Sequence, residues 1–308
     1  MQCAALQVPQ DLRWKAALLA VYILSCATLF LNPLRELCRL SLSSDTYSHI
    51  LLVPFISVFL IYTERESVFQ KTGGTSRITA IFFSIGVLLS AVTRLFGFSI
   101  SPDASLAMAI LGVLFLVWSG FSWVYGSRAV RAGLFPLLFL LLMVPLPASV
   151  LGRFIVWLQW GSADVTSWIF HATGTPAVRD GLFFALPSVT IEIAKQCSGI
   201  RSATALLITC LAGSYLMLRT PWTRAVLLLA AVPVLILKNG IRITTLTLLA
   251  IHVNPGFLDG RLHHEGGVVF FAVGLLILLP VLWWLQRVER NRGDVQALAQ
   301  LKIEVVAN

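Results

Sequence analysis

Apolar runs recur along the whole chain, separated by short stretches that carry lysine and arginine. Several runs approach the roughly 20 residues that a helix needs to cross the hydrocarbon core of a bilayer. Such a helix satisfies its own backbone hydrogen bonds where no water is available. With 57% hydrophobic and only 12% charged residues among 308, the chain lacks the polar surface of a soluble globular protein. The sequence therefore predicts an all-α fold, a polytopic integral membrane helical bundle.

Hydropathy predicts about eight transmembrane helices. The first run follows Arg13 and Lys15 without a convincing cleavage site, so we expect it to be a retained helix. One membrane domain is expected over residues 1–292, followed by a short cytoplasmic C-terminal tail over 293–308. The predicted spans are 16–31, 47–62, 78–98, 104–125, 133–148, 198–218, 223–252 and 266–285.

The distribution of lysine and arginine between the connections predicts the orientation of the chain, because cytoplasmic loops retain positive charge. With eight spans, both termini lie inside. The connection around Pro102-Asp103, the 149–197 segment and the 253–265 loop then lie outside, although some arginines fall there too. The clusters assigned to the cytoplasmic side are Arg13/Lys15, Arg65/Lys71/Arg77, Arg128/Arg131, Arg219/Arg224 and Arg287/Arg290/Arg292.

Cys197 lies where a polar-faced segment runs into an apolar span, in the stretch Cys-Ser-Gly-Ile-Arg-Ser. Lys195 and Arg201 flank it, and the start of a helix adds unpaired N–H groups and a positive dipole end. Such surroundings favour the thiolate, which is the nucleophilic form of cysteine. The competing interpretation is an inert buried cysteine, a common state for this residue. We interpret Cys197 as a candidate nucleophile.

Arg242 lies within the predicted span 223–252, in the motif Asn239-Gly240-Ile241-Arg242. An ionisable side chain in a span normally faces the bundle interior or a wet cavity. Lys238 and Asn239 precede it by about one helical turn, so the three side chains form a polar stripe on one face. Snorkelling to the lipid headgroups is the alternative, and it suits Lys238 better than Arg242.

His263 and His264 stand just before the last span, next to Glu265 and Gly266. Two adjacent imidazoles do not easily bind one ion, and no group of residues at metal-ligand spacing accompanies them. An imidazole beside a thiolate can instead move protons near neutral pH. The predicted topology brings Cys197, Arg242 and His263 to the outer side of the membrane, on neighbouring antiparallel helices.

In their order and spacing, these motifs resemble those of the exosortase/archaeosortase family. The similarity covers roughly residues 40 to 285. The segments that carry the resemblance are Glu192–Ser202, Asn239–Arg242, His263 with Gly267 four positions later and then Phe270-Phe271, Pro145-Leu146-Pro147, and Gly181 through Leu186-Pro187.

The resemblance implies a membrane-embedded cysteine protease or transpeptidase. Its substrates would be exported proteins with a C-terminal sorting signal, which consists of a short motif like Pro-Glu-Pro, one transmembrane helix and a basic cluster (a PEP-CTERM-like signal). Cys197 matches the nucleophile of the family, Arg242 its essential arginine and His263 its histidine, with His264 as the alternative. The active site would face the periplasm at the cytoplasmic (inner) membrane, and the activity would be linked to exopolysaccharide and surface-protein assembly.

Two rival functions stay open at this point. A polytopic transporter or assembly scaffold would use Arg242, His263 and Lys238 to line an anionic pathway, because such residues in spans commonly mark substrate routes. An enzyme of lipid or acyl transfer would use the same cysteine on another substrate. Retention of function in Cys197→Ser would favour the transporter.

The remaining sequence signals concern partners and cofactors. Cytoplasmic arginines and anionic lipid headgroups account for the net charge of +9, so membrane lipid is an expected partner and nucleic acid is not. The sequence has no phosphate-cradling glycine loop and no metal cluster, so we expect no cofactor.

Overall fold

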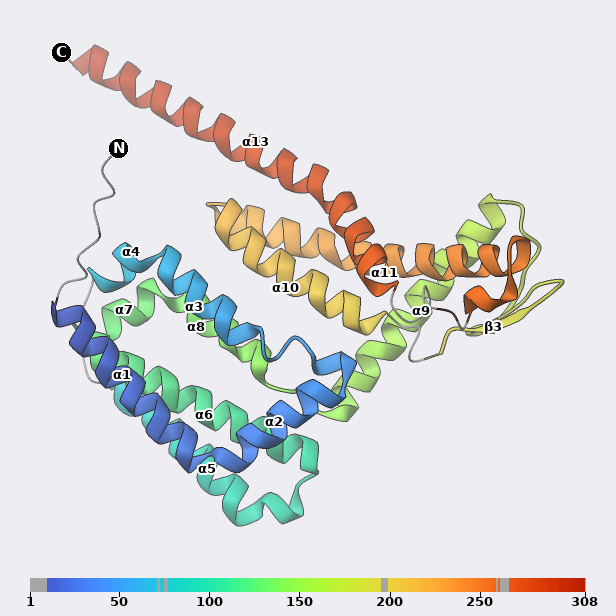
Figure 1. Cartoon of the computed structure of the whole chain (residues 1–308). Helices are drawn as coiled ribbons and strands as arrows, with labels where there is room; N and C mark the ends of the chain where they lie inside the picture. Colours follow the sequence, from blue (N-terminus) through green and yellow to red (C-terminus); the bar gives the residue numbers. More distant parts are fainter. Residues whose placement is uncertain are drawn as a thin grey trace. The chain divides into compact units, whose positions relative to one another are not determined.

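The computed structural model describes residues 10–70, 73–74, 77–194, 199–258, 260 and 266–307, and side chains within 12–292 of these ranges. The chain divides into two compact units, Met1–Leu151 and Gly152–Asn308, and each is described by itself (Figure 1). The helices of the first unit are α1 (Gln10–Leu29), α2 (Leu31–Ser43), η1 (Asp45–Tyr47), α3 (Val53–Thr63), α4 (Arg65–Phe69), α5 (Arg77–Phe96), η2 (Gly97–Ser99), α6 (Pro102–Tyr125), α7 (Ser127–Ala132), α8 (Leu134–Phe139) and η3 (Leu140–Met143).

The second unit combines helices with a small sheet. Its first helix, α9, begins at Ala148, just before the boundary between the units. The elements are α9 (Ala148–Ala172), β1 (Val178–Asp180), β2 (Phe183–Ala185), β3 (Thr190–Glu192), α10 (Ile200–Met217), α11 (Pro221–His252), η5 (Pro255–Leu258) and α13 (Gly267–Ala307).

The predicted helical membrane fold is confirmed. Among the described residues, six helices are long and apolar enough to cross a bilayer, and the broken pair Leu134–Met143 and Ala148–Ala172 would make a seventh. The count of eight was therefore approximate. The six candidate spans are Leu12–Leu29, Arg77–Ser99, Pro102–Tyr125, Ile200–Met217, Pro221–His252 and Gly267–Arg292.

Two of the expected spans differ in the structure. In 47–62, the helix α3 has 11 residues, which is about half the length that a bilayer core requires. In 133–148, the helical part ends at Met143, because the prolines at 145 and 147 have no N–H to continue it. Helix α13 also continues from the last span through the expected tail to Ala307.

In the first unit, α6 packs against α1, α2 and α5. Small residues allow the close approach of α5 and α6: Gly86 lies against Leu116, and Gly112 lies against Ser90. Such residues favour packing between membrane helices because the backbones come close together. A hydrogen bond from Trp118 Nε1 to the carbonyl of Leu137 (3.2 Å) connects α6 to α8.

In the second unit, α10, α11 and the first part of α13 run side by side (Figure 1). Their shared core includes Leu206, Leu235 and Leu278. The carboxylate of Glu289 on α13 caps the start of α11. It accepts the backbone N–H of Thr220 (2.7 Å) and the hydroxyl of Thr223 (2.6 Å). An anion at this end of a helix is favourable because of the unpaired N–H groups and the helix dipole.

The sheet was not expected from the sequence. Its three strands are antiparallel in the order β1-β2-β3, and Phe184 pairs with Ile191. Both side chains are buried while their neighbours along the strands are exposed, which is the alternation of a sheet with one packed face. The packed face contacts α9, where Phe170 meets Phe184 edge to face at 5.7 Å.

Candidate active site

The polar stripe predicted on α11 faces the interior of the second unit. Lys238 and Asn239 are each 1% exposed, and Arg242 is 9% exposed. The prediction of an inward-facing polar stripe is confirmed. Snorkelling, the alternative that suited Lys238, does not occur, because its ammonium group is buried and donates a hydrogen bond to Ser202 of α10.

Gly199 brings the cysteine motif and the arginine motif together. Its φ of 68° lies in the left-handed region, which favours glycine. A Cβ atom at this position would overlap Oδ1 of Asn239. The side chain of Asn239 is held in turn by its hydrogen bond from Nδ2 to Ser162 Oγ of α9 (2.9 Å). Two motifs 40 residues apart in the sequence are thus in direct contact.

Ser202 joins Lys238 to the same glycine. Its hydroxyl accepts the hydrogen bond from Lys238 and donates one to the carbonyl of Gly199 (3.1 Å). The backbone N–H of Ala203 donates to this carbonyl as well (2.8 Å). The start of α10 is therefore fixed by a side chain of α11 and by the helix itself.

Helix α9 carries further residues of the site that were not predicted from the sequence. Ser162 holds Asn239, and Gln159 Nε2 donates to the carbonyl of Ile193 (2.7 Å), just before the segment that contains Cys197. Gln159, Ser162 and Thr166 are buried on one helix at spacings of three and four residues. This pattern of small polar residues in an otherwise apolar stretch was the signal that could have placed α9 in the site.

A glycine on each helix lets α9 pack against α11 at the level of the motif. A Cβ on Gly240 would overlap Cγ1 of Val165, and one on Gly161 would lie 2.9 Å from Cδ1 of Ile236. Gly240 stands between Asn239 and Arg242, so the absence of its side chain lets α9 approach the polar stripe. Packing against α9 therefore explains why the Asn-Gly-Ile-Arg motif has a glycine at this position.

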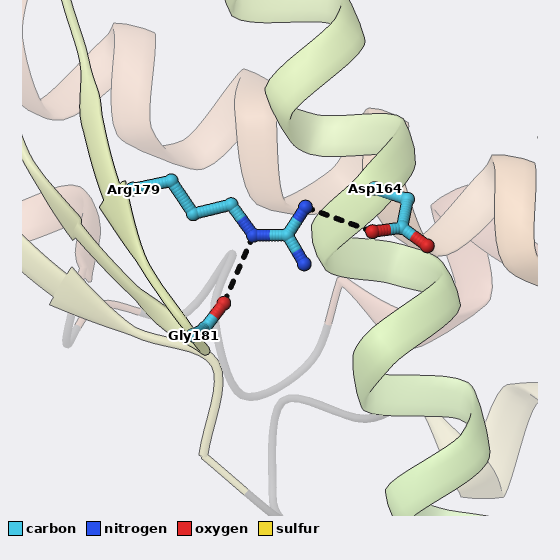
Figure 2. A network of polar contacts seen from close by, with 3 residues as sticks. All are labelled: Asp164, Arg179 and Gly181. Carbon is cyan, nitrogen blue, oxygen red and sulfur yellow. Dashed lines mark hydrogen bonds and ion pairs between the residues drawn. The ribbon is translucent and has the colours of Figure 1, made fainter.

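Arg179 fixes the sheet to α9 (Figure 2). Its guanidinium donates from Nε to the carbonyl of Gly181 (2.9 Å) and forms an ion pair with Asp164 of α9 (2.8 Å). The same group lies 5.8 Å from the ring centroids of Trp160 and Phe184. The strand β3 that leads toward Cys197 therefore belongs to a sheet anchored on α9, the helix whose Ser162 also binds Asn239 of the polar stripe.

Of the three predicted catalytic residues, the structure describes only Arg242. Arg242 is placed in the buried polar cluster. Cys197, His263 and the alternative His264 lie outside the described residues. Their described neighbours along the chain are Gly199, which contacts Asn239, and Gly266, which is buried just before α13.

The cluster formed by Ser162, Ser202, Lys238, Asn239 and Arg242 combines two cationic side chains with hydroxyl and amide groups in a buried setting. Positive charge and fixed donors in a water-poor site stabilise anions strongly. Within the described ranges, no group of three His, Cys, Asp or Glu side chains is placed to bind a metal ion. The arrangement suits stabilisation of a negatively charged intermediate.

A family model described as transmembrane exosortase matches residues 41–280, which is well over half of the chain. The chain belongs to the transmembrane exosortase family. The exosortase match spans both units and includes the two motifs that meet at Gly199. Exosortases are in general membrane transpeptidases that act on sorting signals, so this exosortase is a multi-pass membrane protein of that general kind. Comparison with curated proteins and with solved structures gives no match.

Proposed function

We propose that this exosortase is a thiol transpeptidase or protease that cleaves PEP-CTERM-like C-terminal sorting signals of exported proteins. The signal would consist of a short motif, one transmembrane helix and a basic cluster. Cleavage takes place at the periplasmic face of the cytoplasmic membrane and serves exopolysaccharide and surface-protein assembly. The observation that supports this proposal most is the contact between Gly199 and Asn239, which links the cysteine motif to the arginine motif.

In the proposed reaction, the thiolate of Cys197 attacks the carbonyl carbon of the scissile peptide bond. The electron pair of the carbonyl moves to oxygen, and the buried guanidinium of Arg242 balances this negative charge. The C–N bond then breaks as His263 gives a proton to the departing amine, which leaves a thioester on Cys197. Water, or an acceptor amine or hydroxyl, attacks the thioester and regenerates the thiol.

Each of the three residues has a defined contribution in this scheme. Proton transfer by a positioned imidazole contributes roughly 10²–10⁴-fold to the rate, and a fixed donor at the oxyanion contributes about 10²–10³-fold. Removal of the Cys197 thiol leaves no nucleophile for the covalent step. We therefore expect Cys197→Ala to lose more cleavage activity than Arg242→Gln. Comparison of His263→Ala with His264→Ala shows which histidine donates the proton.

Co-expression with a reporter tests the proposal. The reporter is an exported protein that ends in a signal motif, a transmembrane helix and a basic cluster, and its size is followed by immunoblot. We expect the wild-type chain to shorten it and Cys197→Ala to leave it intact at equal expression. Shortening by Cys197→Ala would show that Cys197 is not the nucleophile. Cys197→Ser separates this activity from the transporter or scaffold alternative, which does not require the thiol.

A further inference from the structure

Lys238 is the most buried charged side chain described at the site, and the reaction above does not use it. It is 1% exposed, and no carboxylate of a described residue lies within ion-pair distance of its ammonium group. Burial of a charge without an opposite charge costs free energy, and apolar side chains of similar volume often serve as well or better. Packing alone therefore does not account for a lysine at this position.

The hydrogen bonds of Lys238 lead to the peptide group of Gly199. Its ammonium donates to Ser202 Oγ, and the Ser202 hydroxyl donates to the Gly199 carbonyl. Hydrogen bonds in such a series polarise one another in a low-dielectric interior. The positive charge on α11 is thus connected through one hydroxyl to the backbone at the start of α10.

Gly199 follows Cys197 by two positions in the sequence. On the other side of the segment 195–198, the carbonyl of Ile193 is held by Gln159. The two described ends of this short segment are therefore each fixed by a buried polar side chain. Gln159 does this from α9 with a neutral amide, whereas Lys238 does it from α11 with a charge.

We propose that Lys238 is a positioning residue for the thiol: through Ser202 it holds the backbone that follows Cys197 and adds positive charge to that of Arg242. The inference rests on the proposed function of Cys197 and assigns a role that the catalytic scheme leaves open. A nearby cation favours a thiolate over a thiol. Lys238 and Arg242 stand four residues apart on one helix, so both positive charges lie on the same face of α11.

The other elements packed against Lys238 contribute few charges. Gly274 of α13 and Leu206 of α10 lie beside each other near the aliphatic stem of Lys238. On α10, Arg201 precedes Ser202 and is exposed. The described cation that shares the interior of the site with Lys238 is therefore Arg242, and a change at Lys238 should alter the local charge substantially.

Alkylation of Cys197 by iodoacetamide tests the inference without a substrate. The full chain is embedded in lipid nanodiscs, and the rate for the peptide that contains Cys197 is followed by mass spectrometry from neutral to alkaline pH. We expect Lys238→Met and Ser202→Ala to slow alkylation about tenfold at neutral pH and to reach the wild-type rate at alkaline pH. Lys238→Arg should stay closer to wild type, and Ser202→Thr, which keeps the hydroxyl, should match it.

Thr247→Val is the matched control, because Thr247 is a buried polar residue of α11 whose hydroxyl bonds to the carbonyl of Ile243 in its own helix. It should leave the pH profile unchanged. An identical profile for wild type, Lys238→Met and Ser202→Ala would overturn the inference, as would a Cys197 that resists alkylation at every pH. If Lys238→Met fails to fold, the alkylation profiles of Ser202→Ala and Ser202→Thr test the inference in its place.

The test separates this inference from the proposed function. Reporter cleavage by Cys197→Ala contradicts the proposed function whatever the alkylation profile shows. Loss of cleavage in Cys197→Ala together with an unchanged profile in Lys238→Met contradicts only the positioning role. In the reporter assay, Lys238→Met should lower kcat by up to about 100-fold, as misplacement of a reacting group does, with little change in KM.

Discussion

Gly199 shows how much of the site depends on the absence of one side chain. Its left-handed backbone and its contact with Asn239 both exclude a Cβ atom. In the sequence, this glycine is visible only as a member of the Cys-Ser-Gly-Ile-Arg-Ser stretch. The contact with Asn239 could not be predicted from the sequence. Spacing along one helix shows which residues share a face, but it does not show which residue of another helix contacts them.

Gly199→Ala should destabilise the protein. An L-residue in the left-handed region costs about 1–2 kcal/mol, and the overlap with Asn239 adds to this cost. We expect a lower midpoint of thermal unfolding and loss of reporter cleavage. Gly213→Ala on the same helix is the control: a Cβ there meets no neighbouring atom within 4 Å, so it should stabilise α10 by about 0.5–1 kcal/mol. Equal melting of the two variants would contradict this account of Gly199.

The polar stripe was the part of the site that the sequence predicted well. The spacing of Lys238, Asn239 and Arg242 places them on one face of any helix, and desolvation turns that face inward. The partners Ser162 and Ser202 were not predicted, because a single serine is common in membrane helices. Only the spacing of Ser162 with Gln159 and Thr166 marks a buried polar face on α9. Lys238 is buried and does not reach the headgroups, because the hydroxyl of Ser202 accepts a hydrogen bond from its ammonium group.

At the scale of elements, α9 differed most from expectation. Its polar residues, among them Gln159 and Asp164, lower its hydropathy, so the segment 149–197 was treated as a connection outside the membrane. In the structure, α9 is a helix of 25 residues, and its narrow polar face is buried at the site. Hydropathy averages over all faces of a helix and therefore overlooks one that turns its polar side inward.

The cap of α11 by Glu289 gives a test at this scale. The carboxylate accepts hydrogen bonds from the backbone of Arg219 and Thr220 and from the hydroxyl of Thr223. Glu289→Ala should lower the free energy of unfolding by about 1.5–3 kcal/mol, the usual contribution of a hydrogen bond to a charged group. The substitution does not change any residue of the Cys197, Arg242 and His263 motifs. The measurement is thermal or denaturant unfolding in detergent.

Glu66→Ala is the control for this prediction. Glu66 is exposed on α4, and substitutions of exposed residues away from special contacts usually change stability by within about 0.5 kcal/mol. A Glu289→Ala protein as stable as Glu66→Ala would show that the contact between α13 and α11 contributes little. In that case the start of α11 would be held by its apolar core alone.

For the whole molecule, the helical membrane fold followed directly from composition and apolar runs, and the structure and the family match agree with it. The number and limits of the spans differ from the prediction, because the helix in 47–62 is short and prolines interrupt the run at 133–148. The division into two compact units had no signal in the sequence, since apolar composition continues across residue 151.

Orientation is the prediction that belongs to this scale. The distribution of arginine and lysine places the connection that contains Glu66 in the cytoplasm and the connection after α11 in the periplasm. A cysteine at Val253, an exposed residue, should react with an impermeant maleimide added to spheroplasts, and a cysteine at Glu66 should react only after lysis. Peptide mass spectrometry separates these sites from the native cysteines. The reverse pattern would place the proposed active site in the cytoplasm.

The most direct test of the central claim is a search for the thioester on Cys197. The exosortase is mixed with a signal-bearing substrate, quenched in acid and digested, and the peptide that contains Cys197 is examined by mass spectrometry. We predict an acyl adduct at Cys197 that hydroxylamine removes and that is missing from Cys197→Ala. Substrate cleavage with an unmodified Cys197, at times when the adduct should accumulate, together with cleavage by Cys197→Ala, would contradict the claim.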